Sequence, residues 1–150
     1  ILDGRIDVVA TDHAPHTKDE KNGSYFNAPS GGPLVQHALV AMLDLVHDGL
    51  LPVEKVADLM AHRVARLFRM SDRGFIRPGM KADLVLVHPN DPWTVREDNV
   101  MSKCGWSPFT GHVFKSRVHE TWVNGTCVWD GRRITTSHGN HAGQRLTFNR

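Results

Sequence analysis

Three side chains that can take part in acid–base or metal chemistry lie close together near the start of the sequence. Asp12, His13 and His16 stand in the string Asp-His-Ala-Pro-His. A carboxylate and imidazoles can bind a metal ion or pass a proton between water and a substrate. Asp after a strand is also a common turn former, and His is often only a surface hydrogen-bonding residue. The residue types therefore leave a catalytic and a structural interpretation open.

The segment before these side chains favours the catalytic interpretation. Residues 6–11 are mostly small or β-branched and apolar, which predicts a strand buried on both faces in a parallel sheet. Pro15 disfavours helix at the residue before it, so the chain turns into a loop there. Catalytic groups of α/β proteins collect at the carboxyl ends of such strands. We therefore expect Asp12, His13 and His16 at the rim of a sheet.

The remaining pattern predicts helices first and an antiparallel β module second. Apolar residues recur at helical spacing over 34–47 and from Pro52 to about Phe68, with Met42 and Met60 as core residues. Asn124-Gly125 predicts a type I′ hairpin, and Asp83 is expected to accept hydrogen bonds from backbone donors at a tight corner. The expected strands are 75–77, 82–87, 93–95, 113–123 and 126–129.

Composition excludes several classes of partner. The 150 residues hold 18 basic and 16 acidic side chains, a net charge of +2, which indicates neither nucleic acid nor a membrane surface as a partner. No apolar run approaches the ~18 residues that would span a bilayer. Two cysteines form neither a disulfide framework nor a Cys-x-x-Cys metal site. The expectation is a reduced, cytoplasmic protein.

Four strings, in order, resemble the dihydroorotases, which are members of the metal-dependent amidohydrolase superfamily. The resemblance runs from Ile6 to about Asp130 and rests on residues 12–16, 25–33, 77–84 and 103–111. It implies an α/β fold: the last strand and helices of a (β/α)8 TIM barrel, followed by part of a small antiparallel β-sandwich. The implied divisions are a barrel part at 1–70, a β module at 71–136 and a tail at 137–150.

The resemblance also implies a reaction and roles for particular residues. The reaction is the zinc-dependent, reversible cyclisation of N-carbamoyl-L-aspartate to L-dihydroorotate in pyrimidine biosynthesis. Asp12 is implied as metal ligand and as catalytic acid and base, and His16, Ser30 and Gly31 as substrate contacts. One or two Zn²⁺ ions are implied, with most ligands upstream of this chain. The implied partners are the small-molecule substrate, the upstream part of the same enzyme and, as one arrangement, a second copy in a homodimer.

Several alternatives stay open. A TIM barrel takes about 250 residues, so we expect a carboxy-terminal part that is inactive alone. A related hydantoinase, dihydropyrimidinase or allantoinase is the nearest rival, against which His16 speaks, and a non-catalytic assembly subunit is another. The charged run at 17–24 is expected to be a solvated loop. His138 and His141 could chelate a metal, but the tail is expected to be flexible.

Overall fold

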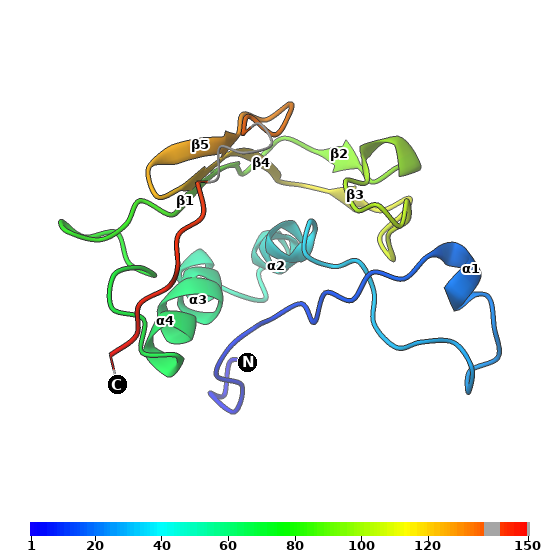
Figure 1. Ribbon diagram of the computed structural model, residues 1–150, viewed down its shortest axis with the longest axis horizontal. Coiled ribbons are helices and arrows are strands. Elements are labelled where there is room, and N and C mark those ends of the chain that lie inside the picture. Colours follow the sequence, from blue (N-terminus) through cyan, green and yellow to red (C-terminus); the bar gives the residue numbers. More distant parts are fainter. Residues whose placement is uncertain (137–141, 150) are drawn as a thin grey trace.

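The computed structural model describes residues 1–136 and 142–149, and consists of helices beneath antiparallel sheets (Figure 1). His138 and His141 lie outside the described residues. In Figure 1 the sheets form the upper layer, α2, α3 and α4 lie below them, and α1 stands apart at the right. The helical elements are α1 (Lys18–Lys21), α2 (Ala38–His47), α3 (Val53–Ala57), the π-helix η1 (Asp58–His62), α4 (Arg63–Leu67) and the 3₁₀-helix η2 (Glu97–Asn99). The strands are β1 (Leu84–His88), β2 (Trp93–Thr94), β3 (Val113–Phe114), β4 (Arg117–Val123) and β5 (Thr126–Trp129).

The expected antiparallel β module is confirmed. Strands β1, β4 and β5 form one sheet in the order β1-β4-β5, and β2 pairs with β3 in a second. The hairpin at Asn124-Gly125 has φ of 50° and 79°, the positive values that a type I′ turn needs. Asp83 accepts a hydrogen bond from the backbone N–H of Asn124 at 2.8 Å, which confirms its structural role at this corner.

Three predicted strands differ from what the described residues form. The strand predicted over 113–123 is divided into β3 and β4, which lie in different sheets. Residues 6–11 are extended but pair with no strand in the described part of the chain, and Ile6 is exposed. A strand buried on both faces needs neighbours on both edges, and here Val9 alone is bonded, through its N–H to the Leu59 carbonyl at 3.2 Å. Residues 75–77 are not a strand either, because the Phe75 ring stacks on His62 instead, with ring centroids 4.8 Å apart.

The two predicted helices form, with different details. The first begins at Ala38 rather than Leu34, because residues 34–37 make a turn whose side chains bond to the 99–107 segment. The second is a continuous helical run of α3, η1 and α4, with one π-helical turn in its middle. Pro52 lies just before its first residue.

Helix α2 joins the two hydrophobic clusters that hold the layers together. One face packs Met42 against Leu51, Val56 and Leu59, with Met60 beside them. The other face packs Val40 against Val95 and Phe114 of the β module. The core role of both methionines is confirmed. Because only the turn at residues 34–37 separates α2 from the loop at residues 29–33, this packing fixes the position of the carboxyl end of that loop.

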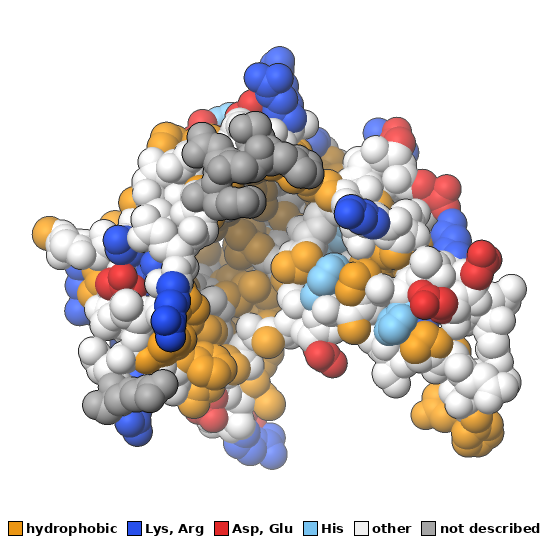
Figure 2. Space-filling model, in the orientation of Figure 1, with side chains coloured by type: hydrophobic (Ala, Val, Ile, Leu, Met, Phe, Trp, Pro, Cys, Tyr) orange, Lys and Arg blue, Asp and Glu red, His pale blue; other side chains and the backbone are white. Residues whose placement is uncertain are grey.

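Figure 2 shows the same view as a surface: charged side chains lie mostly at the periphery, and hydrophobic ones wall a central hollow. None of the helices in the described residues is long and apolar enough to cross a membrane. Residues 142–149 run back along the helices, where Ser71 and Asn149 make backbone hydrogen bonds with Thr147 and Arg69.

Candidate functional site

Asp12 stands at the end of the extended segment with its carboxylate free. Its φ is 46°, in the left-handed region that few residues other than Gly adopt, although Asp tolerates it better than most. The residue is exposed, and no hydrogen bond or ion pair joins its carboxylate to another described residue. An unusual backbone conformation that presents an unpaired acid outward is typical of a functional position. It suits a group that binds a metal or transfers a proton.

His13 and Ala14 tie this segment to the glycine loop, residues 29–33. His13 and Gly32 form an isolated parallel bridge, and the Ala14 N–H donates to the Gly32 carbonyl at 3.2 Å. The His13 Nδ1 accepts a hydrogen bond from the Val35 N–H at 3.2 Å, which leaves Nε2 as the protonated nitrogen of the neutral ring. The bridge thus brings the acid-bearing segment and the glycine loop side by side, and the His13–Val35 bond adds a contact just after the loop.

Gly31 shows how close this approach is. Its φ is 94°, and a Cβ added there would lie 2.5 Å from the Cβ of Ala14. Glycine is required here for two reasons: a residue with a side chain is strained at this φ, and no side chain fits the gap to Ala14. Ser30 and Gly31 are exposed. The structure therefore places the predicted substrate contacts Ser30 and Gly31 beside the segment that carries Asp12 and His16.

His16 is fixed mainly through its backbone. The Trp106 indole Nε1–H donates to the His16 carbonyl at 2.7 Å, across 90 residues of sequence. The imidazole Nδ1 lies 3.7 Å from a Glu20 carboxylate oxygen. The side chain is 31% exposed, so one edge of the ring is open to a ligand.

The charged run after His16 is partly helical, which corrects the expectation of a loop. Helix α1 begins with a capping box: the Thr17 hydroxyl accepts from the Glu20 N–H, and the Glu20 carboxylate accepts from the Thr17 N–H. These bonds, first the one from the Thr17 backbone, lower the pKa of the Glu20 carboxyl. The Thr-x-x-Glu spacing is the signal that could have revealed this helix in the sequence.

Sequence reasoning also missed Lys21, which lies on α1 and reaches the glycine loop. Its Nζ donates to the carbonyls of Pro29 at 2.5 Å and Gly31 at 3.0 Å. The run Lys-Asp-Glu-Lys is typical of a solvated face, and nothing in its composition singles out one lysine. Trp106 stands in a motif used for the resemblance, but its bond to His16 has no signature in the sequence.

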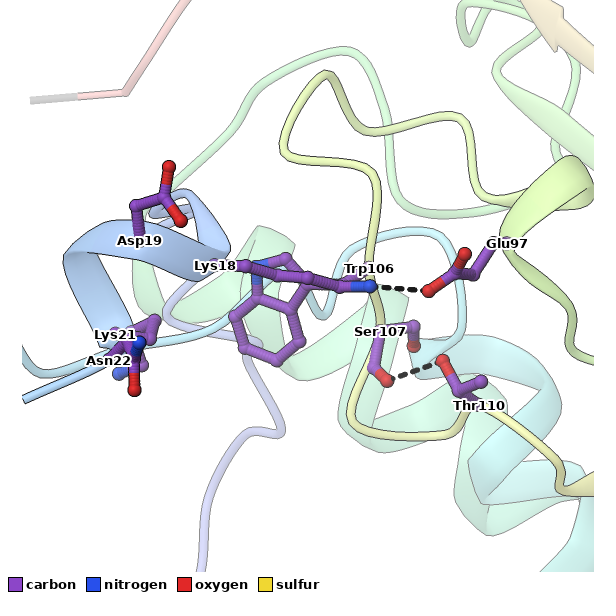
Figure 3. Close-up of a pocket in the computed structure, with 8 residues that line it drawn as sticks. All are labelled: Lys18, Asp19, Lys21, Asn22, Glu97, Trp106, Ser107 and Thr110. Carbon is purple, nitrogen blue, oxygen red and sulfur yellow. Dashed lines mark hydrogen bonds and ion pairs between the residues drawn. The ribbon is translucent and has the colours of Figure 1, made fainter.

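A pocket of about 510 Å³ opens beside α1 rather than over Asp12 (Figure 3). Trp106 forms one wall, and Lys18 reaches across to Glu97. Its lining residues are Lys18, Asp19, Lys21, Asn22, Glu97, Trp106, Ser107 and Thr110. None of the predicted catalytic or substrate residues is among them, so the pocket is separate from the Asp12 segment, although Lys21 links it to the glycine loop.

The described residues can supply one ligand to a metal site, the Asp12 carboxylate. Within residues 1–136 and 142–149, no group of three or more His, Cys, Asp or Glu side chains is arranged to hold a metal ion. Zinc sites in proteins use three or four protein ligands. The exposed Asp12 carboxylate is chemically suited to be one of them, and the others would have to come from beyond the described residues.

Comparison with known proteins decides the family. The sequence model described as "Amidohydrolase family" matches residues 12–129. The chain belongs to the amidohydrolase family. This match begins at Asp12 itself and runs through the glycine loop and the β module to the end of β5.

Two relatives with similar sequences are both named dihydroorotase. The chain is 45% identical over 144 residues to a protein of Halobacterium salinarum named dihydroorotase, covering 96% of the chain and 34% of that protein. It is 39% identical over 133 residues to a dihydroorotase of Clostridium acetobutylicum, covering 88% of the chain and 31% of that protein. The chain spans about a third of the length of these curated relatives.

A solved structure shows the same arrangement of elements. The L-hydantoinase (dihydropyrimidinase) of Arthrobacter aurescens superposes with a TM-score of 0.87 at 26% identity, covering 97% of this chain and 33% of that one. The amidohydrolase-type fold of this part is thus shared between proteins named for different cyclic amides.

Proposed function

We propose that this chain belongs to a metal-dependent hydrolase that acts on cyclic amides. Asp12 would supply its catalytic carboxylate, and the glycine loop would supply part of the substrate-binding loop. The observation that supports this most directly is the pairing of an outward, unbonded Asp12 with the exposed Ser30–Gly31 backbone. A ring amide needs a proton acceptor for water on one side and donors for its oxygen atoms on the other. The two juxtaposed segments carry these two kinds of group.

Within this function, we propose the dihydroorotase reaction. In the hydrolytic direction water adds to a ring carbonyl carbon while Asp12 takes its proton, and Asp12 then gives that proton to the ring nitrogen as the carbon–nitrogen bond breaks. Ring closure of N-carbamoyl-L-aspartate is the reverse, with loss of water. His16 and the N–H groups near Ser30 and Gly31 are assigned to hold the substrate.

A bound Zn²⁺ would lower the pKa of water from its value in bulk solvent to about 7 and polarise the carbonyl. Asp12 is the ligand that this chain would offer, and upstream residues of the same protein would complete the site. In this proposal residues 6–11 become the last strand of a TIM barrel, and the β module becomes part of a small sandwich beside it. The protein would then work in the cytoplasm in pyrimidine synthesis, and the 150 residues alone would be inactive.

Two other functions compete with this proposal. The structural likeness to a hydantoinase favours a cyclic amidohydrolase with another ring as substrate. A non-catalytic assembly subunit would keep the fold without turnover. His16, together with identity of up to 45% to dihydroorotases, favours dihydroorotate over both.

A substrate panel on the complete protein tests these alternatives. The panel holds dihydroorotate, N-carbamoyl-L-aspartate, hydantoin, dihydrouracil and allantoin, assayed before and after chelation and after addition of Zn²⁺. We expect dihydroorotate to have the highest kcat/KM, with activity lost on chelation and restored by zinc. Preference for another ring would contradict the dihydroorotase assignment, and absence of both turnover and metal would support the assembly subunit.

A further inference from the structure

Lys21 makes two hydrogen bonds that fix the orientation of the glycine loop. The ammonium donates to the carbonyl of Pro29 at 2.5 Å and to that of Gly31 at 3.0 Å. Lys21 is partly buried, and it lies one helical turn after His16, so it connects the two segments of the candidate site. A charged donor shared between two carbonyls gives hydrogen bonds stronger than neutral ones.

These bonds determine where the neighbouring N–H groups point. No cis peptide bond occurs in the described residues, and in a planar trans peptide the N–H points opposite to the C=O. Because the Pro29 and Gly31 carbonyls point toward Lys21, the N–H groups of Ser30 and Gly32 point away from it. The N–H groups of Ser30 and Gly31 donate to no other described residue and remain available as donors, whereas the Gly32 N–H is taken up in the parallel bridge with the Asp12–Ala14 segment.

Besides Lys21, the loop is held by contacts with the Asp12–Ala14 segment, none of which orients the Pro29–Ser30 peptide. Gly32 is fixed through its carbonyl, which accepts from Ala14 and from Leu34, and Gly31 is limited by its close approach to Ala14. Exposed backbone rich in glycine would otherwise sample several orientations of each peptide. Lys21 is the one side chain among the described residues that bonds to the loop carbonyls on both sides of Ser30.

We propose that Lys21 is a positioning residue for substrate binding: it holds the Pro29–Ser30 peptide with its N–H directed at a carboxylate or carbonyl oxygen of the substrate, and it holds the Gly31–Gly32 peptide in its pairing with the Asp12–Ala14 segment. The inference rests on the proposed function. Lys21 touches no reacting atom, and its positive charge draws electron density from the two carbonyls, which makes the opposite N–H groups better donors. Its effect is therefore on binding rather than on bond making.

Three variants of the complete protein test this role. Lys21→Met removes the donors and keeps the aliphatic stem, Lys21→Arg keeps two donors, and Lys18→Met removes a lysine from the same helix that pairs with Glu97 instead. We expect Lys21→Met to raise KM about tenfold with kcat nearly unchanged, as the loss of a charged hydrogen bond would. Lys21→Arg should recover most of the affinity, and Lys18→Met should match the unaltered protein. Equal KM values for the two methionine variants, or no recovery with arginine, would overturn the proposal.

Hydrogen exchange gives a readout that does not depend on turnover. The amides of Ala14 and Gly32, which pair the two segments, should exchange faster in Lys21→Met than in Lys18→Met, and unchanged exchange would overturn the role of Lys21. If the unaltered protein hydrolyses no cyclic amide, the proposed function fails and this exchange measurement alone decides for Lys21. Should Lys21→Met not fold, Lys21→Leu, which also lacks a donor, replaces it in both measurements.

Discussion

At the scale of single residues, the candidate site depends on unusual backbone positions more than on unusual side chains. Asp12 has a positive φ, a conformation that costs roughly 1–2 kcal/mol for residues with a Cβ. Gly31 accepts its positive φ without such a cost and leaves room for Ala14. The residue types of Asp12, His16, Ser30 and Gly31 could be identified in the sequence, but the contacts of Lys21 and Trp106 could not, because hydrogen bonds between distant residues leave no pattern in the sequence.

His37 is the residue whose chemistry is most altered by the fold. It is fully buried, stacked against Trp93 and Phe114, and its Nδ1 is 3.2 Å from the Ser107 hydroxyl. The Nε2 has no partner among the described residues. Burial lowers the pKa of the imidazole below its usual 6.5, because desolvation disfavours the charged form.

The lowered pKa of His37 predicts a loss of stability in acid. Below pH 6.5 the unfolded chain takes up a proton that the folded chain refuses, so the free energy of unfolding falls by up to about 1.4 kcal/mol per pH unit. This contribution is complete above the unfolded pKa and declines as the pH falls from 6.5. His37→Phe keeps a ring in the same place and removes the titration. Denaturant unfolding at pH 7.5, 6.5 and 5.5 should show a shallower decline for the variant, and parallel declines would contradict this reading of the buried imidazole.

At the scale of elements, predictions succeeded where a pattern is local. The Asn124-Gly125 hairpin and β5 follow from turn chemistry and alternation, and α2 and the α3–η1–α4 run follow from apolar periodicity. The failures have tertiary causes. Residues 34–37 are held in a turn by the 99–107 segment, and Phe75 stacks on His62. Residues 6–11 have no strand neighbour within the part of the chain that the structure describes. The π-helical turn η1 carries Leu59, which is fully buried in the core.

The segment at 99–107 links the β module to the candidate site, and Trp106 tests that link. Trp106→Phe keeps an aromatic wall and removes the N–H that bonds to the His16 carbonyl. We expect KM to rise several-fold and the free energy of unfolding to fall by about 1 kcal/mol, the typical value of one hydrogen bond. Trp122→Phe removes a comparable bond to Glu120 within the sheet, and serves as the control for kinetics of the complete protein. A KM that rises equally in both variants would argue against a specific role for Trp106.

At the scale of the whole molecule, the surface of this part is apolar in places where a larger fold would cover it. Ile6 is 47% exposed although it opens a run of apolar residues, and the chain spans about a third of its curated relatives. The identity of the family could be predicted from four short strings. The place of residues 6–11 in a barrel does not follow from the contacts within this chain, because a strand of a closed barrel pairs with a neighbouring strand on each side.

The barrel placement predicts strong protection of one segment in the complete protein. If residues 6–11 are a central strand, their amides should exchange with solvent as slowly as those of α2, because both would open only with global unfolding. Hydrogen exchange of the complete protein measures this directly. Exchange as fast as that of the exposed loop at residues 22–27 would show that the segment is not a barrel strand.

The central claim is that the Asp12 carboxylate moves the proton in ring opening and closure, and Asp12→Asn in the complete protein tests it most directly. The amide keeps the size of the side chain and loses its basicity. With folding verified and metal content measured alongside, we predict that kcat falls about 10²- to 10⁴-fold in both the hydrolysis of dihydroorotate and the cyclisation of N-carbamoyl-L-aspartate. Undiminished turnover in either direction would contradict the account.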